Sequence, residues 1–263
     1  MRAKTEPTER RTAREIFRKV EENAQGEIRR STHALAFSGL AGGMSMGLTG
    51  IGVASAMVAL DHTAGRDFVA YMLYPIGFVA VIIGRAQLFT ENTLYPVALI
   101  LSERRHVLET ARLWGVVFSC NVIGAIAFAA LAVCTNALNP DIHSSLVHLG
   151  SLAVAGSNSH IFWSGVIGGW IIALVAWLVT ASHWTIGQIA VIWLLTFVVG
   201  VGHFSHCIAS TGEIMSAVFA GAVPFSRYLQ WLALATAGNI FGGVTIVTLL
   251  NFGQVKAGEE SAG

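Results

Sequence analysis

The sequence predicts an all-α polytopic membrane protein, with six transmembrane spans built as two inverted three-span repeats with two broken helices. Three observations predict it. The 263 residues are 54% hydrophobic and only 12% charged, whereas a soluble domain has about 25% charged residues. Two apolar runs are too long for one crossing and have polar centres. Two short motifs each occur twice, in the same order.

Residues 1–30 are hydrophilic and hold nine of the 16 Lys and Arg. They contain no short apolar core, which excludes a cleaved signal peptide. Residues 7–30 predict a helix with one apolar side, formed by Ile16, Phe17, Val20 and Ala24. Such a helix suits the membrane surface or the face of a neighbouring subunit. A solvated basic arm is the alternative.

The first half of the membrane domain is expected to contain three spans. The first covers residues 32–60 and the third covers residues 113–133. Between them, residues 68–101 exceed the about 20 residues that cross a bilayer as a helix. The centre of this run, residues 84–93, is polar and is followed by Pro96. We therefore expect a broken second span.

The second half repeats this plan after a polar loop, residues 135–159, which contains no Lys or Arg. A fourth span is expected at residues 160–179 and a sixth at 229–250. The apolar run 185–225 lies between them and is again too long for one helix. The membrane domain is thus residues 31–252, with repeats at about 31–135 and 158–252, and a short tail at 253–263.

The centre of the second long run, Gly200–Glu213, contains three glycines, two histidines and a glutamate. Ionisable groups at membrane depth are costly and usually functional. Irregular backbone is tolerated at this depth only where it is buried in protein or lines a cavity. This stretch is therefore the first candidate for a functional site.

The positive-inside rule orients the chain. With both termini in the cytoplasm, 13 Lys and Arg lie inside and only Arg66 and Arg227 lie outside. Arg85 is the remaining one, and it is expected at membrane depth. The sequence therefore predicts a multi-pass protein of the cytoplasmic (inner) membrane with cytoplasmic termini.

The repeated motifs indicate an internal duplication. Ser38–Gly43 and Ser164–Gly169 share Ser-Gly-x-x-Gly-Gly, and Asn121–Gly124 and Asn239–Gly242 share Asn-x-x-Gly. Each copy contains three crossings, so the second copy must be inverted. Inverted repeats with interrupted helices are typical of transporters and channels, with the site near mid-membrane.

Each break is expected to start a half-helix. Ser210 and Glu213 fit a capping box, and Asn92 or Thr93 can cap the other half-helix with Pro96 in its first turn. The two positive N-terminal ends would then converge and favour an anion.

Thr90 and His206 are the polar side chains expected at this point. His206 can donate a hydrogen bond and can carry or pass a proton near neutral pH. That chemistry suits a small weak acid, whose neutral form crosses an apolar constriction at much lower cost than its anion. The alternative is a buried histidine that only bonds backbone freed by the break.

Three charged residues, Arg85, Glu91 and Glu213, are expected at membrane depth. An ion pair between Arg85 and one glutamate would brace the loops. A proton or ion relay is the other interpretation.

At these residues the chain resembles the formate/nitrite transporter family, over roughly residues 30–252. Ala86–Thr90 looks like the Leu-Phe-Thr loop motif of the family, and Phe204–Ala209 is similar to its central-histidine motif. Gly238–Gly243 supports the match. The stretch Gln87–Thr93, with Arg112–Val117, resembles the YfdC-like branch of that family.

The resemblance implies an aquaporin-like fold, a homopentamer with one pore per subunit, and passage of small monovalent anions such as formate, nitrite or hydrosulfide. It places Thr90 and His206 at the pore centre. It also implies apolar constrictions at Leu88, Phe89, Phe78 and Val199.

Several positions depart from the family pattern. Ser205 and Ser210 stand where the family has glutamate and asparagine, and Ser157 aligns with its vestibule lysine. Ala173 aligns with a pore asparagine, and Glu91 adds a negative charge. These departures leave open a channel for a neutral or cationic small solute.

A membrane enzyme or sensor on a channel fold is the alternative from another class. Its reactive groups would be His203, His206, Glu91 and Glu213. We find no cofactor motif, no nucleophile motif and no metal-ligand spacing among the cysteines. No cofactor, metal or catalytic residue is therefore expected.

Overall fold

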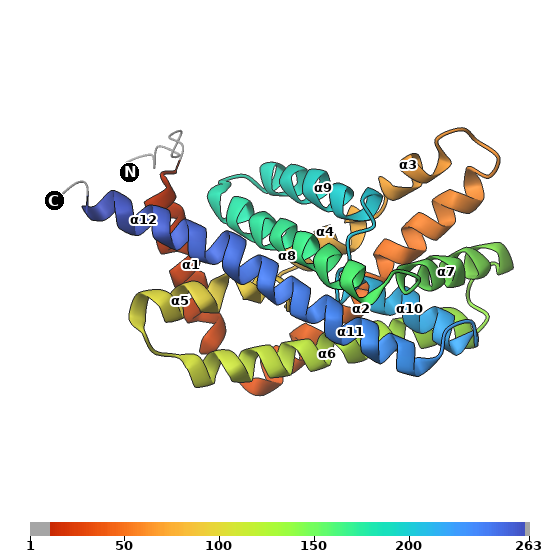
Figure 1. The fold of residues 1–263 in the computed structure, drawn as a ribbon, viewed down its shortest axis with the longest axis horizontal. Coiled ribbons are helices and arrows are strands. Elements are labelled where there is room, and N and C mark those ends of the chain that lie inside the picture. Colours follow the sequence, from red (N-terminus) through yellow and green to blue (C-terminus); the bar gives the residue numbers. More distant parts are fainter. Residues whose placement is uncertain (1–10, 261–263) are drawn as a thin grey trace, which may run out of the picture.

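The computed structural model describes residues 11–260, and within this range every regular element is a helix (Figure 1). The first part of the predicted N-terminal helix, residues 7–10, and the last residues of the predicted tail lie outside the described residues. In chain order the elements are α1 (Ala13–Ile28), α2 (Thr32–Ala59), α3 (Arg66–Tyr71), α4 (Pro75–Ile83), η1 (Glu91–Thr93), α5 (Tyr95–Glu103), α6 (Val107–Cys134), α7 (Pro140–Ala153), α8 (Asn158–Ala181), α9 (Thr185–Val201), α10 (Ala209–Phe219), α11 (Phe225–Phe241), η2 (Gly242–Leu249) and α12 (Leu250–Glu260).

These elements form the six predicted spans. α2, α6, α8 and the continuous α11–η2–α12 segment are single long apolar helices. The second span is α3 and α4, a break, and then η1 and α5. The fifth span is α9, a break, and then α10. Both predicted breaks therefore occur where the polar centres of the long apolar runs lie.

The first break is held by the side chain of Asn121 on α6. Its Nδ2 donates to the carbonyl oxygens of Gly39 (2.7 Å) and Gln87 (2.9 Å), and its Oδ1 accepts from the N–H of Phe89 (2.8 Å). Asn121 is fully buried. Two of these backbone groups, the Gln87 carbonyl and the Phe89 N–H, lie in the break and have no helical partner, whereas Gly39 lies within the continuous helix α2.

The second break is held in the same way by Asn239 on α11. Its Nδ2 donates to the carbonyl oxygens of Gly165 (2.8 Å) and Ser205 (2.9 Å), and its Oδ1 accepts from the N–H of Cys207 (2.9 Å). The partners occupy equivalent positions in the two repeats. The duplicated Asn-x-x-Gly motif is therefore a scaffold for the breaks.

The serines of the other duplicated motif complete the scaffold. The N–H of Gln87 donates to Ser38 Oγ (3.1 Å), and the N–H of Ser205 donates to Ser164 Oγ (3.0 Å). The last glycine of the motif allows the close helix contact. A Cβ on Gly43 would lie 2.0 Å from the Asn121 carbonyl oxygen, and one on Gly169 would lie 2.2 Å from that of Asn239.

α1 packs its apolar side on its own chain, so the alternative of a solvated basic arm was wrong. Its buried residues are Ile16, Phe17, Val20, Ala24 and Ile28, and it contacts α5 and α12 (Figure 1). Thr12 and Glu15 form a capping box at its start. The hydrogen bond from the Thr12 N–H holds the pKa of the Glu15 carboxyl below its ordinary value.

One expectation about the polar loop was wrong. The predicted loop 135–159 contains the 14-residue helix α7, which packs against α10 and α2. The tail predicted at 253–263 begins as helix, because α12 continues the last span to Glu260. The intervening η2 is a π-helix, in which Thr248 Oγ1 donates to the carbonyl oxygen of Thr93 (3.1 Å).

We expect Asn121→Ala and Asn239→Ala each to destabilise the protein by about 3 kcal/mol, because each leaves one N–H and one carbonyl group of a break without a partner. In detergent this should lower the apparent Tm by roughly 6 to 12 °C. Asn158→Ala, at an exposed position, is the control and should change stability by less than about 0.5 kcal/mol. Equal Tm values for all three variants would contradict the bracing role.

Candidate functional site

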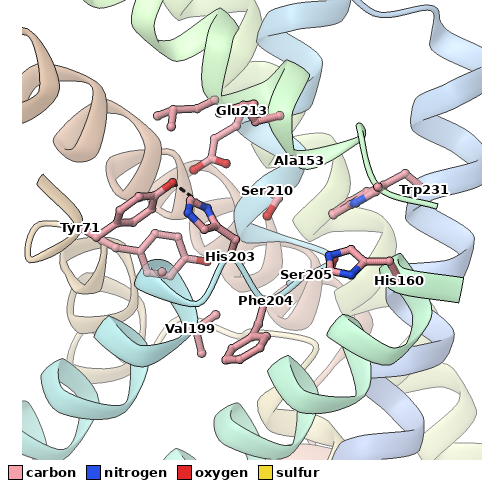
Figure 2. A pocket seen from close by; sticks show the side chains of 15 residues that line it. Tyr71, Ala153, His160, Val199, His203, Phe204, Ser205, Ser210, Glu213 and Trp231 are labelled. Carbon is pink, nitrogen blue, oxygen red and sulfur yellow. Dashed lines mark hydrogen bonds between the residues drawn. The ribbon is translucent and has the colours of Figure 1, made fainter. Parts of the chain in front are cut away.

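A cavity of about 270 Å³ lies between α7, α8, α9, α10 and α11, and we call it the α7-side cavity. Figure 2 shows the side chains that line it. Its polar lining residues are Tyr71, Tyr74, His160, His203, Ser205, Ser210, Glu213 and Trp231. No Lys or Arg lines this cavity.

A smaller cavity of about 90 Å³ lies at the first break, under α1, and we call it the α1-side cavity. Residues of the break line it together with Asn23 and Glu27 of α1. The residues from the break are Arg85, Ala86, Gln87, Leu88, Glu91 and Asn92. The two cavities share no lining residue.

Thr90 and His206 join the two breaks between these cavities. Thr90 Oγ1 and His206 Nε2 lie 2.8 Å apart, and both residues are fully buried. The Phe78 ring packs edge-on against the imidazole, with centroids 5.1 Å apart. Neither Thr90 nor His206 lines either cavity.

The hydrogen bonds fix which nitrogen of His206 carries the proton. Nδ1 accepts from the N–H of Ala209, 3.0 Å away. A nitrogen that accepts carries no proton, so the proton of the neutral ring is on Nε2 and is donated to Thr90 Oγ1. A second proton would have to enter on Nδ1, against the Ala209 N–H. The arrangement therefore holds His206 as a neutral donor.

The predicted capping box of α10 is wrong. α10 begins at Ala209, and neither Ser210 nor Glu213 caps it. The His206 ring takes the Ala209 N–H instead, and the His206 carbonyl oxygen accepts from the Ser210 N–H (3.1 Å). The first amides of α10 are thus already paired, and they offer fewer free donors to an anion than expected.

The caps predicted for α5 are also wrong, although Pro96 does lie in its first turn. Asn92 Nδ2 donates to Gln87 Oε1 (2.9 Å), within the loop. Thr93 Oγ1 donates backwards to the carbonyl oxygen of Thr90 (2.8 Å). These side chains form hydrogen bonds within the short η1 turn that precedes α5, and they do not cap the N-terminus of α5.

The three predicted charges form no ion pair with one another. Arg85 is exposed, with φ 60°, and it makes no ion pair with a carboxylate of the described residues. The bracing ion pair was therefore a wrong expectation, and so was burial of Arg85. Arg85 and Glu91 both line the α1-side cavity, together with Glu27, and Glu213 lines the α7-side cavity.

The predicted constriction residues do not form one ring. Leu88 lines the α1-side cavity and Val199 lines the α7-side cavity. The Phe89 ring packs on α6, with centroids 5.6 Å from Trp114 and 5.0 Å from Phe118. Phe89 lines neither cavity, and Phe78 lies against His206 itself.

Sequence reasoning missed three aromatic residues of the α7-side cavity. Tyr71 is the last residue of α3, and Tyr74 directly precedes α4. The Tyr71 hydroxyl lies 3.1 Å from His203 Nδ1. Trp231 on α11 is fully buried, and its Nε1 has no hydrogen-bond partner. A buried indole N–H usually has a partner, so a tryptophan within an apolar span was a signal that could have been used.

The sequence matches a known protein family over most of its length. The family model for the formate/nitrite transporter matches residues 14–253. The chain belongs to the formate/nitrite transporter family. It is thus a membrane transporter or channel of that family, with several helical spans.

Individual family members agree with this assignment. The inner membrane protein YfdC of Escherichia coli is 31% identical over 92% of this chain and 78% of its own length. A probable formate transporter of Methanothermobacter thermautotrophicus is 29% identical over 75% of this chain and 79% of its own. The inner-membrane relative and the helical spans support a multi-pass protein of the inner membrane.

Solved structures share the fold at lower identity. An FNT family ion channel superposes with a TM-score of 0.78 at 19% identity, over 91% of this chain and 98% of that one. A pentameric formate channel with formate bound superposes with a TM-score of 0.69 at 17% identity, over 83% and 95%. These matches confirm the predicted fold.

We expect Thr90→Val to lower the free energy of unfolding by about 1–3 kcal/mol, because it leaves the buried His206 Nε2–H without an acceptor. Thr90→Ser keeps the hydroxyl and should stay close to the unmodified protein. Thermal unfolding in detergent measures both. Equal losses for valine and serine would show that packing, and not the hydrogen bond, sets the stability here.

Proposed function

We propose that this chain is a channel or transporter for a small monovalent weak-acid anion of the formate, nitrite or hydrosulfide kind. The solute crosses the central constriction in its protonated, neutral form. His206 donates a hydrogen bond to it, with Thr90 as the exchange partner of the imidazole. No step needs a covalent intermediate, so we assign no enzymatic role.

The observation that best supports this proposal is the buried Thr90–His206 pair, which joins the two breaks, with one cavity lined by residues of each break. Around the pair, the path is apolar, with Phe78 on the imidazole. A bare anion loses its hydration there at large cost, whereas a neutral acid with one acceptor needs only the Nε2–H. The names of a probable formate transporter and of a formate channel support the same solute class.

The acidic cavities favour a second candidate, a neutral or cationic small solute. Glu213 lines the α7-side cavity, where no Lys or Arg of the described residues lies, and in the α1-side cavity Glu27 and Glu91 accompany Arg85. Flux of methylammonium or glycerol that exceeds formate flux in the same vesicles would decide for this candidate.

We also propose a homopentamer with one pore per subunit, in the inner membrane with both termini cytoplasmic. The count of Lys and Arg supports the orientation. The related pentameric channel supports the assembly. In this orientation the α1-side cavity opens to the cytoplasm and the α7-side cavity opens to the outside.

Formate flux into proteoliposomes tests the role of His206. We expect His206→Asn to lower the flux about tenfold, as the loss of one well-placed hydrogen bond predicts. The loss should be similar at pH 5.5 and pH 7.5, because the structure holds His206 as a neutral donor. A changed shape of the pH profile would instead support a proton relay through the ring. No flux with the unmodified protein would count against the channel itself.

Mass photometry of the detergent-solubilised protein tests the assembly. A pentamer of the 27.9 kDa chain should give one main species at about five times that mass, after subtraction of the micelle. A main species at one or two chain masses would contradict the pentamer.

A further inference from the structure

The α7-side cavity contains several polar groups that the fold does not use. The Trp231 Nε1–H is fully buried and has no acceptor. Within the described residues, the Glu213 carboxyl and the Ser210 hydroxyl make no hydrogen bond, although both line the same cavity. A buried polar group without a partner is rare, and the Trp231 Nε1–H is one. Ser210 and the partly exposed Glu213 line the same space of about 270 Å³. This is the pattern of a site built for a small polar ligand.

The arrangement of these groups suits a ligand with two different ends. In Figure 2, Trp231 lies across the cavity from Tyr71 and His203, with Ser210 between them and Glu213 above. Trp231 can only donate a hydrogen bond, whereas a carboxyl can donate one or accept one. An oxygen of the ligand can therefore take the indole N–H while a second atom meets Glu213.

Among the described residues, no Lys or Arg lies in the α7-side cavity to pair with Glu213. The titratable groups that face it are Tyr71 and Tyr74 from the second span, His203 from the break and His160 from α8. α7 contributes only apolar side chains to the cavity: Leu149, Leu152 and Ala153. On α2 it meets Gly50, where a Cβ would lie 2.8 Å from its Cγ. An unpaired carboxylate in such surroundings is costly, so the carboxyl and its proton are available to a ligand.

We propose that the α7-side cavity is a binding station for the weak-acid anion, and that Glu213 gives the anion its proton before it reaches His206. The O–H bond of the Glu213 carboxyl breaks and a new O–H bond forms on the anion, which leaves a carboxylate and a neutral acid. The carboxylate then regains its proton from a hydronium ion of the outside solution, which enters the cavity and is left as water. Trp231 holds the anion by its Nε1–H. This inference rests on the proposed function and assigns the proton donor within it.

Exchange of isotope-labelled formate across proteoliposomes, at equal pH inside and outside, tests the station whichever way the protein inserts. Glu213→Gln keeps the shape and removes the proton. We expect it to slow exchange about tenfold at pH 7.5, and less than about twofold at pH 5, where solution already supplies neutral acid. Protein-free liposomes give the blank. Glu213→Asp should restore most of the rate at pH 7.5.

Glu109→Gln is the matched control, since Glu109 is half-exposed at the start of α6. It should exchange formate as the unmodified protein does. Trp231→Phe should raise the half-saturating formate concentration several-fold and leave the shape of the pH profile unchanged. An unchanged half-saturating concentration would remove Trp231 from the station.

Each other outcome for Glu213→Gln overturns the proposal. Unchanged exchange at both pH values means that the proton comes from elsewhere. Faster exchange at pH 7.5 means that Glu213 repels the anion. Loss at both pH values means that its role is structural. If the unmodified protein exchanges no formate, the proposed function fails as well, which separates that failure from failure of the Glu213 inference alone.

Discussion

The structure depends on two asparagine side chains. Each break places backbone N–H and carbonyl groups inside an apolar helix bundle, where they have no water and no helical partner. Asn121 and Asn239 supply the missing bonds, each with three hydrogen bonds to loop or helix backbone. Without these two side chains, backbone groups of the breaks would stay unpaired in an apolar environment, which would destabilise the protein.

The two breaks share a scaffold and differ in chemistry. The position equivalent to His206 in the first repeat is Leu88, and the position equivalent to Thr90 in the second is Ile208. The hydrogen bond at the centre therefore joins unlike positions of the two repeats. A symmetric frame thus carries an asymmetric site, with a nitrogen donor from one repeat and an oxygen acceptor from the other.

Most of the fold could be predicted because membrane spans follow from length and hydropathy, and because the duplicated motifs gave the inversion. The helix α7 could not be predicted in the same way. It is a short, partly polar element that packs against α10 and α2. Its buried residues are Leu146, Leu149 and Gly150. The packing of α7 depends on helices that are distant in the sequence, so the local hydropathy pattern does not predict it.

The sequence predicted that Thr90 and His206 lie together at the candidate site. It did not predict the hydrogen bonds and side chains around them. Ser210 and Glu213 match a capping box by spacing, but α10 begins one residue earlier, at Ala209, whose N–H donates to the His206 ring. Arg85 and Glu91 are close in sequence, yet the positive φ at Arg85 turns the chain and leaves the guanidinium exposed. Trp231 is remote in sequence from both breaks. Such outcomes depend on side-chain competition in three dimensions.

The bracing bonds to the loops end on backbone atoms only: the N–H of Gln87, Phe89, Ser205 and Cys207, and the carbonyl oxygens of Gln87 and Ser205. The frame therefore places few demands on the side chains of the loops. Substitutions that change which solute passes can accumulate there while the fold is retained. Divergence of cargo within one architecture is the evolutionary consequence, and the same freedom is available to protein engineering.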